Sequence, residues 1–594
     1  MKKILSLFAL LLIIAAGACS KKKTPDNISD EIAFKKADEL LAKMTLAEKI
    51  GQMTQIDSSV VNFTDITEYG IGSVLSGGDA MPSDIHAKGW AEYCDRVQSM
   101  ALKTRLAIPI IYGIDSLHGS NKTMNAVIFP HHIGLGAANN PALVEKIARI
   151  TAFESRASGF RWAFSPCVAV PLDERWGRTY EGFSEDGSIT AVLGAAEVRG
   201  LQNSFDTNGI AACAKHFIGD GGTQHGIDQG DCVMSEKEIR EKFLPAYEEA
   251  VKNGVLTVMA SYSSIKGEKM HGNRYWLTDV LKNELKFKGF IISDFDALKQ
   301  LGGTSKQTVE KAINAGIDMV MVPYDYKTFI TNLTELVEEK KVSEERINDA
   351  VRRILYVKYK AGLFDSPYSD KDAASKVGSA EHRAVAREAV RESLVVLKND
   401  NFFPLKKDVK KIVLCGDRAS DIGSQCGGWT IDWQGSTGKV TQGTDIVTAF
   451  KNVVSKNTEV IYSKDGTDIA DADKIILVLG ETPYAEFKGD RTELVLNPSD
   501  EDLFETIKKS GKDFAVIFIS GRPMPVAEVI NKSKAFVAVW LPGTEADGIA
   551  DVLFGDHKPK GKLPFSWPAS MKDIPINKGD GKKALFDCGY GLSW

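Results

Sequence analysis

Gly289-Phe290-Ile291-Ile292-Ser293-Asp294 is an apolar run that ends in a carboxylate, and a second carboxylate, Asp296, follows two residues later. A run of this kind predicts a strand buried on both faces, because its side chains do not alternate between apolar and polar. The carboxyl edge of a parallel sheet is where α/β proteins place their binding and catalytic groups. Two roles are therefore open for Asp294, which either caps the next helix or acts on a bound substrate.

Seven further runs of this type lie between residue 50 and residue 322, and helical patterns separate most of them. Asn140-Pro141 is typical of a helix start, while Ser235 and Glu238 form a capping box for another helix that Gly254 ends. Strands that alternate with helices predict a parallel sheet, and eight such units predict a TIM-type (β/α)8 barrel. The eight expected strands are residues 51–56, 72–75, 108–114, 162–169, 210–217, 256–261, 289–293 and 319–322.

A second α/β domain is expected after this region. Turn-forming residues around Pro367 interrupt the alternation of strands and helices. We therefore place a linker at residues 365–385, between a barrel at 32–364 and a smaller domain at 386–594. A helix is expected over residues 381–397. The apolar runs that predict a second parallel sheet are residues 411–415, 460–462, 474–479, 514–519 and 535–540.

The first residues predict an exported protein. Lys2 and Lys3 precede an apolar stretch, residues 4–16, which is shorter than the ~20 residues that a membrane span needs. Ala16-Gly17-Ala18-Cys19 resembles a bacterial lipoprotein box, so we expect a signal peptide at 1–18, a lipidated Cys19 and a tether at 19–31. Such a protein would be periplasmic or anchored in the outer membrane. Ordinary cleavage near this point, without a lipid, is the alternative.

Composition excludes several classes of function. The net charge of -5 and a pI near 6.1 do not indicate the basic surface that a nucleic-acid-binding protein has. The seven cysteines after Cys19 are scattered and form no C-x-x-C pair, so neither a zinc site nor a disulfide framework is indicated. The chain also lacks the G-x-S-x-G, P-loop and H-E-x-x-H motifs, and we expect no metal and no cofactor.

Polar and charged side chains stand where the expected barrel strands end. Taken singly, each has a structural explanation, such as a helix cap for Asp294 or an ion pair within a loop for Arg178. Together they predict the catalytic rim of a barrel. They are Asp115 after the third strand, Arg178 in the loop after the fourth, Lys215, His216 and Asp220 at the fifth, Met259 and Tyr262 at the sixth, and Asp294 at the seventh.

Two carboxylates on either side of a scissile bond suit glycoside hydrolysis, in which one attacks the anomeric carbon and the other protonates the leaving oxygen. Asp294 is the first candidate. The second is expected in the loop that follows the strand at 474–479, where Glu481, Glu486 and Asp490 are all acidic. The residues themselves leave the choice among these three open.

Several motifs together resemble glycoside hydrolase family 3, and in particular its plant-type β-D-glucan exohydrolases. They are Lys215-His216-Phe217-Ile218-Gly219-Asp220, Arg175-Trp176-Gly177-Arg178, Met259-Ala260-Ser261-Tyr262, Ser293-Asp294-Phe295, the opening stretch 43–53 and the closing stretch 586–593. The resemblance covers nearly all of the chain after the tether. It implies a barrel followed by an α/β sandwich domain, with the active site between them.

The resemblance also implies a role for individual residues. It makes Asp294 the nucleophile and Glu486 the acid/base. Trp433 matches the tryptophan that clamps the second sugar, and Phe295 stands where the family usually has tryptophan. The residues that match the glucose subsite or its support are Asp115, Arg178, Lys215, His216, Asp220, Met259 and Tyr262.

The expected function is that of a retaining, exo-acting β-glucosidase that binds β-linked gluco-oligosaccharides. A bacterial N-acetylglucosaminidase of the family would have histidine where Asp220 stands, which argues against that activity. A β-xylosidase of the same family is the alternative enzyme. A lipid-anchored glycan-binding protein with a dead site is the alternative from another class, and it would have lost Asp294 or Glu486.

Overall fold

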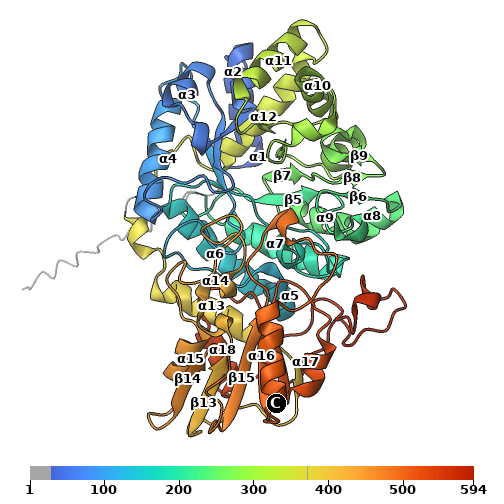
Figure 1. The fold of residues 1–594 in the computed structure, drawn as a ribbon. Helices are drawn as coiled ribbons and strands as arrows, with labels where there is room; N and C mark the ends of the chain where they lie inside the picture. Colours follow the sequence, from blue (N-terminus) through green and yellow to red (C-terminus); the bar gives the residue numbers. More distant parts are fainter. Residues whose placement is uncertain (1–27, 206, 371) are drawn as a thin grey trace, which may run out of the picture.

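The computed structural model describes residues 28–205, 207–370 and 372–594. The described chain forms two domains, drawn one above the other in Figure 1, with the barrel above and the second sheet below. The expected signal peptide and Cys19 lie outside the described residues. No helix within the described ranges is long and apolar enough to cross a membrane.

The upper domain contains all eight strands expected from the sequence. Parallel pairing links β11, β1, β2, β3 and β4 in one sheet and β10, β7 and β5 in another. Parallel bridges from Trp162 to Ala211 and from Ile292 to Met319 join the two sheets into a closed barrel. The strands are β1 (Thr54–Asp57), β2 (Ser73–Ser76), β3 (Ile111–Ile114), β4 (Trp162–Ala163), β5 (Cys213–Phe217), β7 (Thr257–Ala260), β10 (Phe290–Ile292) and β11 (Val320–Met321).

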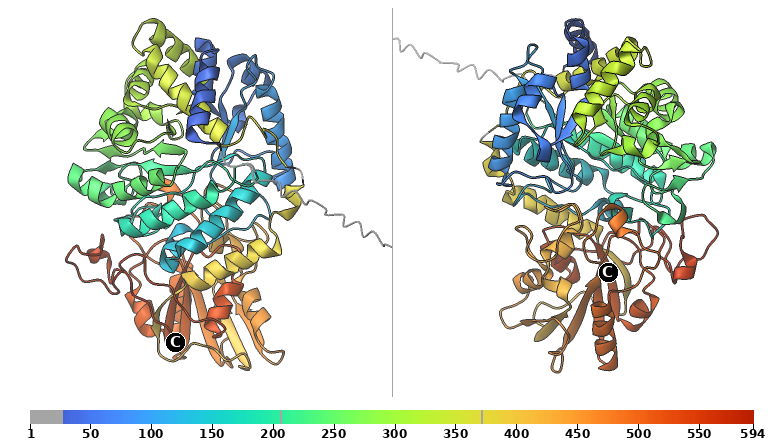
Figure 2. Two further views of the ribbon diagram at one scale, coloured as in Figure 1. Left: turned by 180° about the vertical axis from the view of Figure 1, so that it is seen from behind. Right: turned by 45° about the horizontal axis from the view of Figure 1, so that its top comes forward.

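Helices surround this barrel on its outer side, as both views in Figure 2 show. Asn140 caps α6 and accepts the N–H of Leu143, as its sequence predicts. A short sheet of β6 (Asp231–Cys232), β8 (Ser264–Ile265) and β9 (Glu268–Lys269) lies in the loops after β5 and β7. The helices are α1 (Asp30–Leu41), α2 (Leu46–Gln52), α3 (Phe63–Tyr69), α4 (Ala87–Ala101), α5 (His132–Ala138), α6 (Pro141–Ala157), α7 (Gly187–Leu201), α8 (Glu236–Lys242), α9 (Leu244–Lys252), η5 (Tyr275–Glu284), α10 (Ser305–Ala315), α11 (Tyr326–Glu338) and α12 (Glu344–Lys360).

Two elements of the barrel domain differ from the sequence prediction. The helix expected from Ser235 to Gly254 is divided at Phe243 into α8 and α9, because Pro245 lacks the N–H that would continue the helix. The fourth strand is only two residues long, since Pro166 cannot donate to a sheet. The backbone beyond it still bonds to β5, because the N–H of Val168 donates to the carbonyl of Lys215 at 2.8 Å.

The lower domain is built on a single six-stranded sheet in the order β12-β17-β16-β15-β13-β14. The five expected strands are parallel, and β12 adds an antiparallel edge. Helices cover both faces, with α16 in front of the sheet in Figure 1 and α13 on the side seen from behind in Figure 2. The elements are α13 (Ala380–Ser393), β12 (Val395–Asn399), β13 (Lys411–Cys415), α14 (Ile422–Cys426), α15 (Ile446–Val453), β14 (Glu459–Ser463), β15 (Lys474–Gly480), α16 (Pro498–Lys509), β16 (Phe514–Ile519), α17 (Ala527–Lys532), β17 (Ala535–Trp540) and α18 (Asp547–Leu553).

The helix expected over residues 381–397 was predicted too long. α13 ends at Ser393, and the β-branched residues that follow form β12 instead. Val395 and Val396 pair with β17, where both side chains are buried in the core of the second domain. A neighbouring strand thus outweighs the local helical pattern.

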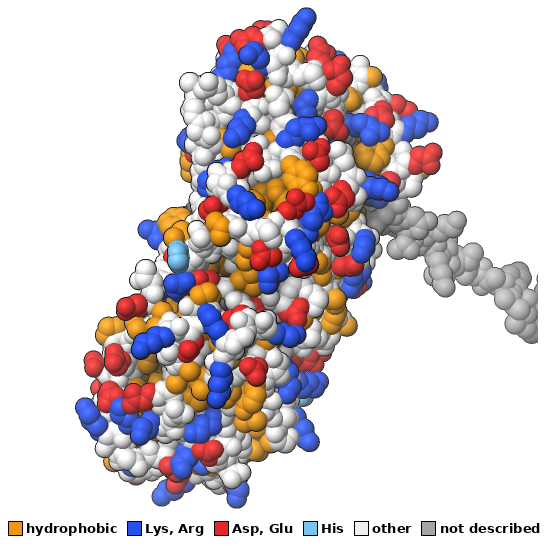
Figure 3. All heavy atoms as spheres, turned by 90° about the vertical axis from the view of Figure 1, so that its right-hand side faces the viewer, with side chains coloured by type: hydrophobic (Ala, Val, Ile, Leu, Met, Phe, Trp, Pro, Cys, Tyr) orange, Lys and Arg blue, Asp and Glu red, His pale blue; other side chains and the backbone are white. Residues whose placement is uncertain are grey.

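The two domains are joined by hydrogen bonds between the loops at the carboxyl ends of the barrel strands and loops of the sandwich. The Tyr180 hydroxyl donates to the carbonyl of Tyr484 at 2.6 Å, and the Ile431 N–H donates to the carbonyl of Asn121 at 2.8 Å. Away from this junction, positive and negative side chains are interspersed on the face shown in Figure 3. That face therefore carries no continuous basic surface for a nucleic acid.

Candidate active site

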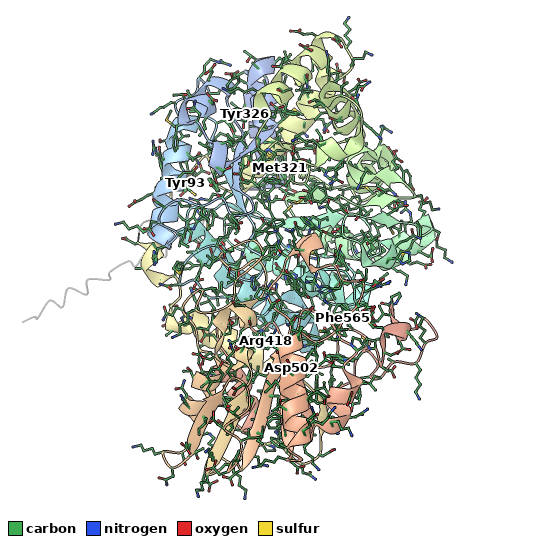
Figure 4. The ribbon with its side chains drawn as sticks, in the orientation of Figure 1. Tyr93, Met321, Tyr326, Arg418, Asp502 and Phe565 are labelled. Atoms are coloured by element: carbon green, nitrogen blue, oxygen red, sulfur yellow. The ribbon has the colours of Figure 1, made fainter. Side chains whose placement is uncertain are left out.

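A cavity of about 500 Å³ lies at the junction of the two domains. Met321 at the end of β11, labelled in Figure 4, contributes to its wall. Ten residues singled out in the sequence line it, and they come from both domains: Asp115, Arg178, Lys215, His216, Met259, Tyr262, Asp294, Phe295, Trp433 and Glu486.

Asp294 follows β10 and lines this cavity. Its Oδ1 accepts the N–H of Phe295 at 2.7 Å, and its own N–H donates to His271 Nε2 at 2.9 Å. Its Oδ2 is buried and has no hydrogen-bond partner among the described residues, and His216 Nε2 lies 3.6 Å away. The 3-10 helix that follows has Asp296 as its N-cap residue and no side-chain cap. Asp294 is therefore not a helix cap.

His216 and Lys215, both from β5, are held by carboxylates. Lys215 Nζ donates to Asp115 Oδ1 at 3.0 Å, and His216 Nδ1 lies 2.5 Å from Asp220 Oδ2. Asp220 also accepts from the Ser261 hydroxyl, and it is not part of the cavity wall. Asp220 thus supports His216, whose Nε2 lies 3.6 Å from Asp294 Oδ2, and a direct contact of Asp220 with the sugar stays a prediction.

Arg178 connects the barrel to the sandwich domain. Its guanidinium forms a two-point contact with Glu181, from Nε to Oε1 at 2.9 Å and from Nη2 to Oε2 at 2.8 Å. Nη1 donates to Glu486 Oε1 at 3.3 Å. Glu181 also accepts the indole N–H of Trp429 at 3.0 Å. A buried two-point contact fixes the plane of a guanidinium, so Arg178 is a rigid neighbour of Glu486.

The geometry separates the three acidic candidates of the loop after β15. Glu481 accepts from Arg522 Nε at 3.0 Å and from the Tyr484 hydroxyl at 2.8 Å, within the sandwich domain. Asp490 accepts two backbone N–H groups of the barrel. Glu486 is the one of the three that lines the cavity. It begins the 3-10 helix η9 (Glu486–Gly489). The orange loop that carries this turn rises from the lower domain toward the barrel strands in Figure 1.

The electrostatic surroundings of the two carboxyls differ. Burial raises the pKa of Glu486 to about 8, and the charges of Asp228 and Asp294 add to this effect while Arg178 opposes it. Burial also raises the pKa of Asp294, but the nearby His216 ring and the Arg178 guanidinium work against the rise. Glu486 therefore holds a proton near neutral pH, as a proton donor requires.

The sequence matches two known protein-family domains, one for each domain of the structure. Residues 45–357 match the glycosyl hydrolase family 3 N terminal domain, and residues 394–594 match the glycosyl hydrolase family 3 C-terminal domain. The chain belongs to glycosyl hydrolase family 3. The predicted glycoside hydrolase activity class and the predicted fold, a TIM-type barrel followed by an α/β sandwich, are both confirmed by this membership.

This family 3 enzyme is similar to proteins with related activities. It is 33% identical to the lysosomal beta glucosidase of Dictyostelium discoideum, over 94% of this chain and 75% of that protein. It is 30% identical to a beta-xylosidase of Formosa agariphila, over 100% and 84% of the two chains. The crystal structure of an exo-1,3/1,4-beta-glucanase from a Pseudoalteromonas species superposes with a TM-score of 0.92 at 38% identity, over 96% of this chain and 75% of that one.

Two aromatic pairs line the wall of the cavity in this family 3 enzyme. The Phe295 and Tyr324 rings of the barrel meet edge to face at 5.8 Å, and so do the Trp433 and Phe487 rings of the sandwich domain. Asp79 of a barrel loop accepts the backbone N–H of Trp433 at 2.8 Å and so holds the second pair against the barrel. Aromatic faces at both walls suit the stacking of a sugar ring.

Sequence reasoning missed part of the cavity wall. Asp57 stands at the end of β1, so the strand-end rule would have found it had it been applied to the first strand as to the others. Tyr324 follows β11 and would have been found by the same rule. Asp79, Trp429 and Phe487 also line the cavity, and nothing in their local sequence marks them.

Proposed function

We propose that this enzyme is a retaining, exo-acting β-glucosidase that releases glucose from the non-reducing ends of β-gluco-oligosaccharides. The observation that carries the proposal is the pair of carboxyls in one cavity. Asp294 has a buried oxygen that accepts no hydrogen bond from the described residues, and Glu486 has a pKa raised to about 8. One is suited to attack and the other to donate a proton. The presence of both argues against a glycan-binding protein with a dead site.

In this mechanism Asp294 attacks the anomeric carbon while Glu486 protonates the departing oxygen, which leaves a covalent glucosyl-enzyme. Glu486, now ionised, takes a proton from water, and the water attacks the same carbon to release glucose with retained configuration. Retention requires the two carboxyl groups to be about 5–5.5 Å apart, and this separation stays a prediction.

The polar residues of the cavity are suited to the hydroxyl groups of a glucosyl unit. Lys215 and Arg178 are donors, Asp115 is an acceptor, and His216 can serve as either. The Tyr262 hydroxyl donates to the carbonyl of Phe295, so its oxygen is left as an acceptor. Contacts that strengthen as the sugar distorts toward the transition state raise kcat as well as affinity. The aromatic pairs would bind the next unit, and Trp433, which lines the cavity, is the residue that would clamp it.

We expect β-1,3 and β-1,4 linked glucobioses to be the better substrates, in keeping with the similarity to an exo-1,3/1,4-beta-glucanase. The measurement is kcat/KM on β-1,2, β-1,3, β-1,4 and β-1,6 glucobioses, with an advantage of at least about tenfold for the first-named pair. A preference for the β-1,6 linkage would contradict this substrate assignment.

A β-xylosidase is the second candidate, because a Formosa agariphila beta-xylosidase covers the whole chain at 30% identity. A site that hydrogen-bonds a substrate hydroxyl discriminates strongly against an analogue that lacks it. We therefore expect 4-nitrophenyl β-glucoside to exceed the corresponding xyloside by about 10²-fold or more in kcat/KM. The reverse order would assign the enzyme to xylosides.

The activity should depend on pH as the two carboxyl groups require. The first step needs ionised Asp294 and protonated Glu486, so kcat/KM rises as Asp294 loses its proton and falls as Glu486 loses its own. Since burial raises the pKa of Glu486 to about 8, the basic limb should lie near that value. With an activated substrate, kcat/KM of the Glu486→Gln variant should no longer fall at basic pH. If it still falls, a group other than Glu486 causes the decrease.

We further propose export of the enzyme and a lipid anchor on Cys19, in the periplasm or on the outer membrane. The lipoprotein-like stretch 16–19 supports this proposal. In cells that express the full chain, radiolabelled palmitate should be incorporated into the wild-type protein and not into Cys19→Ser. A mature protein that carries no label would instead indicate ordinary secretion.

A further inference from the structure

One side chain of the sandwich domain holds two separate loops of the barrel. Asp490 Oδ1 accepts the backbone N–H of Gly177 at 2.8 Å, and Oδ2 accepts the backbone N–H of Asp228, also at 2.8 Å. Gly177 belongs to the loop after β4, and Asp228 belongs to the loop after β5. Both carboxylate oxygens of Asp490 are therefore used for contacts across the domain junction.

This carboxylate stands directly after the helical turn that carries Glu486. Asp490 is the C-cap residue of η9, and its N–H donates to the carbonyl of Phe487 at 3.2 Å. The next residue, Arg491, donates its N–H to the carbonyl of Arg175 at 3.1 Å. A shift of Asp490 relative to the barrel would thus move the whole turn, including Glu486 at its start.

The backbone of Glu486 packs directly against the same barrel loop. A Cβ atom on Gly177 would lie 2.1 Å from the carbonyl oxygen of Glu486, so the two backbones approach as closely as a glycine allows. Glu486 itself has a φ of 52°, a left-handed conformation that is strained for a residue with a side chain. Contacts around the turn must hold this conformation, and those of Asp490 reach two separate loops of the barrel.

We propose that Asp490 is a positioning residue for the acid/base: its two backbone hydrogen bonds to the barrel set the Glu486 carboxyl within reach of the leaving oxygen. The proposal rests on the assignment of Glu486 as acid/base. Proton transfer needs a heavy-atom distance of about 2.6–3.2 Å, and a displacement of 1 Å costs about 10²-fold in rate. Asp294 is on the barrel, so the contacts of Asp490 with the barrel fix the position of the Glu486 carboxyl relative to that of Asp294.

The test is the dependence of kcat/KM on the leaving group in Asp490→Asn. The amide replaces one acceptor oxygen by an NH₂ group, so one of the two backbone N–H groups loses its acceptor. For laminaribiose and phenyl β-glucoside we expect a loss of about 10²-fold. For 2,4-dinitrophenyl β-glucoside, whose leaving group needs no proton, the loss should be within about threefold. Glu493→Gln, an exposed carboxylate in the same loop, should behave like wild type.

Three outcomes would overturn the proposal. If Asp490→Asn lost the same factor in kcat/KM on all substrates, Asp490 would have a purely structural role. If its kcat/KM equalled that of the wild type on all of them, Asp490 would have no role in positioning Glu486. If Glu486→Ala itself shows no leaving-group dependence, the acid/base assignment fails first and the proposal fails with it. Should Asp490→Asn not fold, Asp490→Glu keeps both acceptors one methylene further out and must show the same trend at a smaller size.

Discussion

Asp294→Ala should abolish turnover of 4-nitrophenyl β-glucoside, with kcat reduced by about 10⁴-fold or more. The variant has no group that can form the covalent intermediate, and activation of the leaving group by Glu486 does not replace an attacking atom. Steady-state rates measure the loss. Added azide can enter the space left by the carboxylate and should yield the α-glucosyl azide from an activated substrate.

Asp296→Ala is the matched control for this experiment. Asp296 lies two residues from Asp294, pairs with Lys299 at 2.6 Å and is not part of the cavity wall. Its removal should leave kcat close to that of the wild type. An Asp296 variant as inactive as Asp294→Ala, or an Asp294 variant with substantial activity, would contradict the assignment of the nucleophile.

Glu486→Ala should produce a loss that depends on the leaving group. Disaccharides should lose about 10²–10⁴-fold in kcat/KM, because the departing oxygen is no longer protonated. A dinitrophenyl glucoside should still form the glucosyl-enzyme at nearly the normal rate, and its hydrolysis should then limit turnover. Azide should accelerate that second step and give the β-glucosyl azide, which identifies Glu486 as the base.

Glu481→Gln tests the competing acid of the same loop. Glu481 is engaged by Arg522 and Tyr484 within the sandwich domain, so its loss should lower thermal stability and leave the leaving-group dependence unchanged. If Glu486→Ala hydrolysed disaccharides at the wild-type rate, Glu486 would not be the acid/base. An azide response in Glu481→Gln would then assign that role to Glu481.

Much of the local structure is predictable from the chain alone. Short apolar runs with β-branched residues indicate buried strands, because this pattern is contained in a few consecutive residues. Asn140 and Ser235 start helices because each side chain accepts the N–H of the residue three positions later. Prediction failed where a distant neighbour decides. β12 becomes a strand because β17 is available to it, and that partner lies far along the sequence.

The site shows the same division. By itself the sequence determined that a carboxylate, Asp294, stands at the end of a barrel strand beside Lys215 and His216 on a common rim. The residues alone left the choice among Glu481, Glu486 and Asp490 open, and the family resemblance implied Glu486. Only the tertiary structure shows that Glu486 is the one of the three that lines Asp294's cavity. The physical reason is that this choice depends on the docking of two domains, and hydrogen bonds between distant loops leave no pattern in the neighbouring residues.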